Sequence, residues 1–149
     1  MSISLQKGQK VSLSKESAGL GKIIVGLGWD EAKKSVGGGF LNALFGSATD
    51  VQNIDCDASA IMLKDGKLKG KKDIIYFHNL QHSSGTVKHM GDNLTGAGDG
   101  DDEQIYVDLA SVPADYDKIV FVVNIYSAAS RNQHFGMIKN AYVRIIDQR

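Results

Sequence analysis

The sequence predicts an all-β protein, an antiparallel β-sandwich with short helical turns in long loops. Two observations support this class. Seven to nine short segments alternate apolar and polar residues or are apolar throughout, and glycine rather than proline separates them, with 17 Gly and one Pro in 149 residues. Almost no segment repeats its apolar residues with the helical period. A β-barrel is the alternative arrangement of the same strands.

The expected strands share an alternating or continuous apolar pattern and are residues 3–13 as two short strands, 22–30, 54–64, 73–79, 86–90, 104–109, 118–128 and 140–147. The segment 118–128 is the most apolar, so we expect a central strand with both faces covered. Residues 129–138 are expected to form a helical turn or an irregular crossing. No internal repeat or linker divides the chain, so residues 1–149 are expected to form one domain.

Residues 31–53 are the least regular part of the chain. Three consecutive glycines, Gly37 to Gly39, predict a flexible joint, and apolar residues follow them. We expect a long surface loop whose apolar part folds onto the domain. The alternative is an element that binds a partner or touches a membrane, because long loops and exposed apolar patches are often functional.

The overall composition bounds the function. The chain has 17 basic and 17 acidic residues, so its formal net charge is zero and bulk electrostatics gives no support for nucleic-acid binding. A single cysteine, Cys56, excludes an intrachain disulfide and suits a reducing compartment. No apolar run approaches the roughly 20 residues of a membrane span, and the N-terminus lacks the apolar region of a signal peptide. We therefore expect a soluble cytoplasmic protein.

The most informative segment is residues 91–103, GDNLTGAGDGDDE, which an alternating strand follows directly. Such an acidic run repels itself, so a compact form beside a strand needs a positive partner. Ca²⁺ takes oxygen ligands, and glycine lets backbone carbonyls turn inward. The candidate ligands supply side-chain or backbone oxygen and are Asp92, Asn93, Thr95, Gly98, Asp101, Asp102 and Glu103.

Two further acids lie on the expected strand 54–64. Asp55 and Asp57 share one face about 7 Å apart, whereas Cys56 lies on the other face. Because aspartate is depleted in strands, the pair is either a solvated strand end or a set of ligands for the same cation. Ca²⁺ takes about six to eight oxygens, and the combined acids supply enough for one ion or at most two.

Known motifs do not account for the acidic segment. Residues 92–103 have the length of an EF-hand loop but not its pattern, since Leu94, Gly96 and Ala97 occupy its third, fifth and sixth positions. The glycine pattern GAGDG lacks the Lys-Ser/Thr end of a P-loop and has the wrong charge for bare phosphate, although a metal-bridged phosphate remains an alternative.

Other chemistries have weaker support. The spacing of the four histidines, residues 78, 82, 89 and 134, fits no standard zinc site, so we expect ordinary surface or core histidines. Ser83-Ser84-Gly85 lies in an expected turn and no G-x-S-x-G motif is present. A glycosidase carboxylate pair among Asp55, Asp57 and Glu103 stays open, but clustered acids in a glycine-rich segment fit cation binding better.

Four motifs cover nearly the whole chain and are GWD at 28–30, DCDASA at 55–60, GDNLTGAGDGDDE at 91–103 and NAYVRIID at 140–147. Together they resemble the TerD family of bacterial tellurium-resistance and general stress-response proteins. The resemblance implies a cytoplasmic β-sandwich that binds Ca²⁺, usually two ions, without catalysis. It also implies stress-response partners that gather at the membrane with an integral TerC-like protein.

The resemblance also implies a ligand set. Carried over by position, the calcium-binding residues are Asp55, Asp57, Asp92, Asn93, Asp101, Asp102 and Glu103. Asp99 stands at a variable position of the motif, and Asp30 is expected either to join the site or to cap its strand. The chain departs from the family pattern in its longer, glycine-rich 31–53 segment and at Asn53, where an acid is common.

The acidic residues predict a calcium-stabilised module, and the resemblance implies that it acts as an interaction module in resistance to tellurite and chemical stress. In this mechanism the carboxylates repel one another until Ca²⁺ neutralises them. The alternative is a metal-dependent enzyme acting on phosphate-type or oxyanion substrates, which needs an open coordination position. A lectin-like module is a third possibility, for which Tyr106 is the only aromatic residue near the acidic segment.

Overall fold

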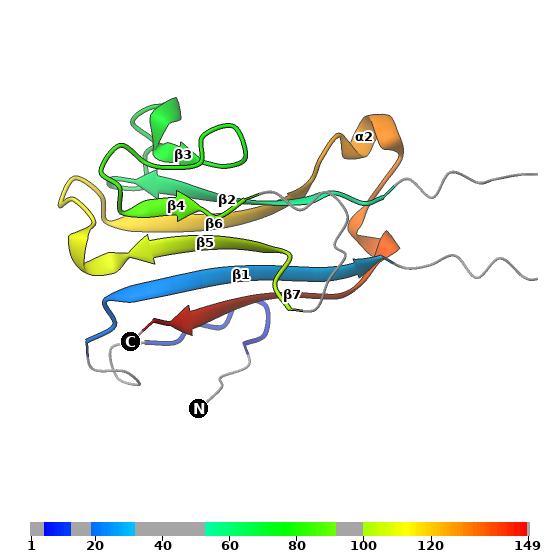
Figure 1. Cartoon of the computed structure of the whole chain (residues 1–149), viewed down its shortest axis with the longest axis horizontal. Coiled ribbons are helices and arrows are strands. Elements are labelled where there is room, and N and C mark those ends of the chain that lie inside the picture. The colour runs from blue at the N-terminus through cyan, green and yellow to red at the C-terminus, as the bar shows by residue number, and fades with distance from the viewer. Residues whose placement is uncertain (1–4, 13–18, 32–52, 92–99, 149) are drawn as a thin grey trace, which may run out of the picture.

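The computed structural model describes residues 5–12, 19–31, 53–91 and 100–148. Within them, antiparallel strands form two sheets that pack against each other with almost no helix (Figure 1). This arrangement confirms the predicted β-sandwich. The two layers meet in one apolar core to which both sheets contribute.

Each sheet is antiparallel wherever its strands pair. The four-stranded sheet has the order β4-β5-β1-β7 and the three-stranded sheet the order β3-β2-β6. The strands are β1 (Lys22–Glu31), β2 (Cys56–Leu63), β3 (Ile74–Ile75), β4 (Val87–His89), β5 (Glu103–Asp108), β6 (Lys118–Ile125) and β7 (Ile138–Asp147). Short helices lie between them and are η1 (Lys71–Asp73), η2 (Leu109–Ser111), α2 (Ala128–Arg131) and η3 (Phe135–Met137).

The core follows the period of two that the sequence shows. Alternate residues of β1 point inward, from Ile23 to Trp29, and each is at most 5% exposed. Cys56, Ala60 and Met62 of β2 are fully buried on the facing layer. Strand alternation therefore decides which residues enter the core, as predicted for residues 54–64.

The most apolar strand is not central, and that prediction was wrong. Among the strands that the structure describes, β6 pairs only with β2 and stands at the end of the three-stranded sheet. Val120 and Val122, on its outer face, are 36% and 37% exposed. A run of β-branched residues favours extended backbone whether or not both faces are covered, so its composition does not reveal its neighbours.

Two other strand predictions need correction. The described residues 5–12 form a turn about Lys7 and Gly8, in which Gln9 N–H donates to the Gln6 carbonyl, but no strand. The expected strand 73–79 shortens to Ile74–Ile75, and a bridge between Tyr76 and Asn79 then turns the chain. The helical turn expected within 129–138 is confirmed by α2 and η3.

The segment 31–53 falls almost wholly outside the described residues. Among the residues that the structure describes, no helix is long and apolar enough to cross a membrane.

Candidate metal centre

The single tryptophan joins the two stretches of chain that carry the predicted acids. Its indole N–H donates to the Ile54 carbonyl at 3.1 Å, and its backbone N–H donates to Asp102 Oδ2 at 2.8 Å. The pairing register between β1 and β7 shifts at this point, between Gly28 and Asp30. Such a bulge redirects a side chain, and here Trp29 connects the start of β2 to the entry of β5.

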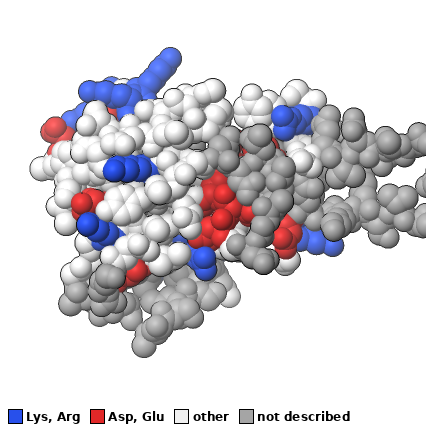
Figure 2. Space-filling view, in the orientation of Figure 1, with Lys and Arg blue, Asp and Glu red and all other residues white. Residues whose placement is uncertain are grey.

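Four predicted ligands lie around this junction: Asp55, Asp57, Asp102 and Glu103. We call them the acid cluster. Three of them are almost completely buried, Asp55 at 6%, Asp57 at 3% and Glu103 at 2% exposure. Acidic side chains gather in the middle of one face of the molecule (Figure 2). Buried carboxylates are costly unless they are paired or bind a cation.

Glu103, the first residue of β5, points into the space between the sheets. Its Oε2 accepts a hydrogen bond from the Ala58 backbone N–H at 2.6 Å and lies 3.4 Å from His89 Nε2. Because His89 Nδ1 accepts from the Gly91 N–H, Nε2 carries the proton that faces Glu103. The sequence reading of His89 as an ordinary residue missed this contact with a predicted ligand.

Asp55 has the least complete set of partners in the acid cluster. Within the described residues, its buried Oδ1 has no hydrogen-bond partner. Burial is the main cause that raises the pKa of Asp55, Arg131 opposes the rise, and the negative charge of Glu103 adds to it. The carboxylate therefore lies in a position that favours either a proton or a second positive charge.

Asp102 shares this electrostatic environment. Burial raises its pKa, the Trp29 N–H works in the opposite direction, and the negative charges of Asp30, Asp101 and Glu103 raise it further. Three neighbouring negative charges therefore disfavour the charged form of Asp102.

Asp57 faces a different direction from Glu103. It stands opposite Asn124 of β6, whose amide Nδ2 donates to Asp57 Oδ2 at 3.0 Å. Alternation along β2 places Cys56 and Ala58 on the core side and Asp57 on the other. Asp57 therefore lies on the outer face of the three-stranded sheet, opposite to the core face that Glu103 enters.

Asp101 lies apart from the acid cluster. Its carboxylate lies on the outer side of the four-stranded sheet, where Arg144 Nε at 2.8 Å, Gln104 Nε2 at 3.0 Å and the Tyr142 hydroxyl at 3.1 Å contact it. Burial alone would raise the pKa of Asp101, but these hydrogen bonds lower it below its ordinary value. Asp101 therefore has a structural role in joining the entry of β5 to β7, and its carboxylate is less available to a metal ion.

Two glycines of β1 make room for this arrangement. A Cβ at Gly26 would overlap the Asp101 carboxylate, and a Cβ at Gly28 would overlap the Tyr142 ring. In the sequence VGLGW these glycines alternate with core residues, so both lie on the outer face of the strand. Glycine repeated on one face of a strand is a signal of close approach, and it was available in the sequence.

Asp30 also has its own partner. Its Oδ2 accepts a hydrogen bond from the Asn140 side-chain amide at 2.7 Å, which joins β1 to β7 beyond the bulge. Asp30 influences the pKa of Asp102, but its carboxylate is held at the sheet surface.

The described donors fit a hard cation in chemistry but do not complete a site. They offer carboxylate oxygens, one of them without a hydrogen bond, in surroundings that disfavour a second negative charge. Within residues 5–12, 19–31, 53–91 and 100–148, no three His, Cys, Asp or Glu side chains are grouped closely enough to hold a metal. The other predicted ligands, Asp92, Asn93, Thr95 and Gly98, lie outside the described residues, as does Asp99.

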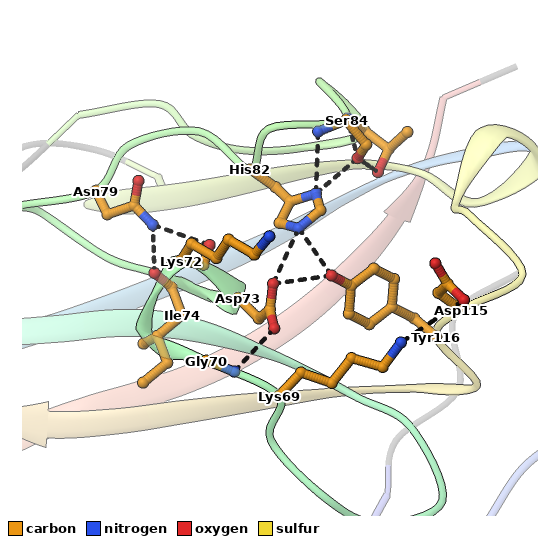
Figure 3. A network of polar contacts seen from close by, with 11 residues as sticks. Lys69, Gly70, Lys72, Asp73, Ile74, Asn79, His82, Ser84, Asp115 and Tyr116 are labelled. Carbon is orange, nitrogen blue, oxygen red and sulfur yellow. Dashed lines mark hydrogen bonds and ion pairs between the residues drawn. The ribbon is translucent and has the colours of Figure 1, made fainter.

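A second buried polar network lies around Asp73, and the sequence reading missed it (Figure 3). Asp73 Oδ1 accepts from the Tyr116 hydroxyl at 2.8 Å and lies 3.3 Å from His82 Nε2, while Oδ2 accepts from the Gly70 N–H at 3.1 Å. On its other side, His82 Nδ1 lies 2.7 Å from Ser84 Oγ.

The order Ser84, His82, Asp73 is that of a catalytic triad, but the contacts indicate a structural role. His82 is 3% exposed and both of its ring nitrogens are engaged. Ser84 Oγ is also 2.7 Å from Thr86 Oγ1, and its turn closes with a hydrogen bond from Gly85 N–H to the His82 carbonyl. The expected turn at 81–85 is therefore confirmed, with a buried histidine at its start.

The fold and the acid cluster define a β-sandwich with acidic residues at the entry of one strand. Comparison with known families identifies the class, because the TerD domain model matches residues 1–149. The chain belongs to the TerD family. This membership confirms the resemblance drawn from the four sequence motifs.

Named relatives are consistent with this membership. The chain is 57% identical over 148 residues to the stress response protein SCP2 of Bacillus subtilis, an alignment that covers 99% of this chain and 72% of that protein. It is 44% identical over 148 residues to the tellurium resistance protein TerD of Serratia marcescens, covering 99% and 69%.

Solved structures share the fold. A homologue of telluride resistance protein (TerD) from Streptomyces coelicolor A3(2) superposes with a TM-score of 0.62 at 19% identity, over 87% of this chain and 67% of that one. A second crystal structure, of a protein of unknown function, gives a TM-score of 0.61 at 21% identity, and this chain spans 65% of its length.

Proposed function

We propose that this chain is a calcium-binding, non-enzymatic interaction module of the bacterial stress response, acting in resistance to tellurite and other chemical stress. The names of its relatives support the stress and tellurium context. The chemistry of the acid cluster supports the cation. The proposed ligands are Asp55, Asp57, Asp102 and Glu103 together with Asp92, Asn93, Thr95 and Gly98, and Asp101 contributes less because Arg144 already holds it.

One observation carries the proposal: Asp55 is buried near other buried acids, and its Oδ1 has no hydrogen-bond partner in the part of the chain that the structure describes. A buried carboxylate without a partner costs stability, and the negative charge of Glu103 increases that cost. A divalent cation removes both costs at once, since it supplies coordination to the oxygen and neutralises the repulsion. Arg131 is the cation that already acts on Asp55, and it offsets the burial only in part.

Calcium therefore acts by neutralisation. The ion joins the start of β2, which carries Asp55 and Asp57, to the entry of β5, which carries Asp102 and Glu103. A ligand that binds only the folded state stabilises it by about 2.7 kcal/mol at a hundredfold excess over Kd. The ordered acidic segment then presents a surface to a partner.

The test is binding and stability with and without the ion. Calorimetric titration with Ca²⁺ should show saturable binding, and the unfolding midpoint should rise with Ca²⁺ and fall with EGTA. Trp29 is the only tryptophan and contacts both halves of the junction, so its fluorescence should change during the titration. Absence of all three responses would overturn the proposal.

Matched variants locate the site. Asp55→Asn and Asp102→Asn should each weaken Ca²⁺ binding by at least about tenfold, since each removes a charged ligand. Asp115→Asn, at a side chain 78% exposed that pairs only with Lys69 among the described contacts, should leave the affinity unchanged. Hydrolysis of a phosphate ester by the metal-loaded protein, lost in Asp55→Asn, would instead support the metal-dependent enzyme.

We further propose cytoplasmic partners, namely other stress-response proteins and a membrane-bound TerC-like protein. Their capture from stressed cells should depend on Ca²⁺ and fail with EGTA. Asp55→Asn should reduce capture as chelation does, whereas Asp115→Asn should not.

A further inference from the structure

Two buried histidines, His82 and His89, make the same pair of contacts with their rings. In each, Nδ1 accepts a hydrogen bond from the backbone N–H two residues further along the chain, at 3.2 Å for His82 and 3.3 Å for His89. In each, Nε2 faces a buried carboxylate, at 3.3 Å from Asp73 and 3.4 Å from Glu103 respectively. The chain therefore uses one arrangement twice, with a different acid each time.

Around His82 this arrangement serves the fold. Asp73 also accepts hydrogen bonds from the Tyr116 hydroxyl and the Gly70 N–H, so three separate parts of the chain meet at one carboxylate (Figure 3). Asp73 is fully buried and is not a predicted ligand. His82 is therefore an internal reference for a histidine of this geometry that has only a structural role.

Around His89 the acid is a proposed calcium ligand. Glu103 Oε2 accepts from the Ala58 N–H of β2 at 2.6 Å and faces His89 Nε2 of β4, so groups from two other strands contact one carboxylate oxygen. The side chains of His89 and Glu103 are 1% and 0% exposed, which limits competition from water. Carboxylates that bind metals are commonly oriented by outer hydrogen bonds of this kind.

His89 also contacts the other end of the acidic segment. Gly91 is the first residue of the segment 91–103 and Glu103 is the last. Because the Gly91 N–H donates to Nδ1, the ring carries its proton on Nε2, where it faces Glu103. Beside the ring, the Met90 N–H donates to the Gln104 carbonyl at 2.9 Å and joins β4 to β5. One imidazole therefore contacts both ends of the segment.

We propose that His89 is a positioning residue for the calcium site, an inference that rests on the proposed function. Its Nε2–H orients the Glu103 carboxylate, and its Nδ1 fixes the start of the acidic segment at Gly91, so both ends are placed before the ion binds. His89 is not itself a ligand, because both ring nitrogens are engaged and Ca²⁺ takes oxygen ligands. Loss of an outer partner of this kind lowers metal affinity about 10- to 100-fold.

Substitutions at His89 separate its two contacts in a calorimetric Ca²⁺ titration of the full chain. His89→Phe keeps a ring but loses both contacts, and its Kd should rise about 10- to 100-fold. His89→Gln keeps an amide N–H that can reach Glu103, and its Kd should return to within about threefold of the wild type. His89→Asn offers an acceptor to the Gly91 N–H but is too short to reach Glu103, so its Kd should stay high.

Two other histidines give matched controls. His82→Phe should lower the unfolding midpoint in EGTA, because it removes a donor to Asp73, but the folded variant should keep the wild-type Kd for Ca²⁺. His134 has the same backbone contact, at 3.1 Å from the Gly136 N–H, on the exposed surface. His134→Phe should therefore fold and leave the Kd unchanged. Equal weakening of Ca²⁺ binding in His89→Phe and either control would overturn the proposal.

The remaining outcomes distinguish the role of His89 from the calcium site itself. Long-range ¹H–¹⁵N NMR spectra should show His89 as the Nε2–H tautomer with and without Ca²⁺, and an Nδ1–H tautomer would overturn the proposal. Rescue by His89→Asn instead of His89→Gln, or an unchanged Kd in His89→Phe, would overturn the role of His89 and leave the proposed function standing. A wild type that does not bind Ca²⁺ would overturn the proposed function and the role of His89 with it.

Discussion

Two buried acids of this protein, Asp73 and Asp55, differ in their partners rather than in their depth. Asp73 is fully buried and Asp55 is 6% exposed. Burial works against both charges, but hydrogen bonds from Tyr116 and His82 lower the pKa of Asp73, whereas the pKa of Asp55 is raised. The donors around a carboxylate, not its exposure, separate the two sites.

This difference separates two roles. The Asp73 network is complete within the chain and joins η1, the turn at His82 and the loop that carries Tyr116. In the acid cluster, burial and neighbouring negative charges raise the pKa of Asp55 and of Asp102, and Asp55 Oδ1 has no hydrogen-bond partner among the described residues. Without such donors a buried carboxylate costs stability, and the proposed calcium ion would remove that cost in the acid cluster.

The largest expected effect comes from breaking the complete network. Asp73→Ala removes the acceptor of Tyr116, His82 and the Gly70 N–H, and leaves buried donors unsatisfied. We expect the free energy of unfolding to fall by about 3 kcal/mol, measured by urea denaturation in EGTA. A loss below about 1 kcal/mol would show that water replaces the carboxylate there.

The second-largest loss of stability is expected when the hydrogen bonds of Asp101 are broken, if they stabilise the fold as those of Asp73 do. Gly26→Ala places a methyl group against the Asp101 carboxylate and should displace it from Arg144. The expected loss is about 2 kcal/mol, again from urea denaturation.

Gly70→Ala is the matched control, because nothing lies near its Cβ position and its φ of −171° is ordinary extended backbone. Its effect should stay within about 0.5 kcal/mol. Equal losses in the two variants would contradict the close approach at Gly26.

The reverse result is expected at Asp55. Asp55→Asn replaces an incompletely partnered buried charge with a neutral group of the same size. Without metal, the variant should be as stable as the wild type or more stable by about 1 kcal/mol. With Ca²⁺ the order should reverse, because the wild type gains the binding energy. A metal-free variant that is clearly less stable would mean that Asp55 has a stabilising partner.

The pH dependence should separate the same groups. A group whose pKa is raised in the folded state contributes stability below its unfolded pKa, and this contribution is lost as the pH rises through its folded pKa. Asp55 and Asp102 are groups of this kind. Asp73 and Asp101 have lowered pKa values, so their contribution is present above the unfolded value and lost as pH falls.

The measurable consequence lies between pH 4 and 6, around and above the ordinary aspartate pKa of about 3.9. Metal-free Asp55→Asn/Asp102→Asn should gain stability with rising pH more steeply than the wild type, because the opposing contribution is gone. Parallel profiles would contradict the raised pKa values.

The smallest effect is expected at an exposed acid beside the Asp73 network. Asp115 pairs with Lys69 at 3.6 Å, and its side chain is 78% exposed. Asp115→Asn should change the free energy of unfolding by less than about 0.5 kcal/mol. A larger change would indicate that Asp115 supports the neighbouring Tyr116 instead of pairing only at the surface.

The sequence predicted the sandwich and its inward faces because alternation reports directly on burial. It also predicted that the carboxylates of 55–57 and 101–103 share one cation, which stays a prediction. The structure describes Trp29 contacting both Ile54 and Asp102, whereas Asp101 contacts Arg144. The edge position of β6 could not be predicted, since periodicity shows which face is buried but not which strands are neighbours.

The sequence also could not predict which partners the acidic side chains at the start of β5 contact. Asp101, Asp102 and Glu103 are consecutive, yet one contacts Arg144, one accepts from Trp29 and one reaches Ala58. Their directions depend on the backbone path into β5. The Asp73 network joins residues 9 and 34 positions apart from His82, and no local pattern connects them.

Cys56 gives the chain a natural reporter of local opening. It is fully buried between Asp55 and Asp57, and burial, reinforced by the neighbouring acids, raises the pKa of its thiol to about 12. A thiol reagent at neutral pH can therefore react only in molecules whose β2 has left the core. Because the chain has one cysteine, the labelling rate of the unmodified protein measures how often that strand detaches, and a ligand that fastens Asp55 and Asp57 should slow it.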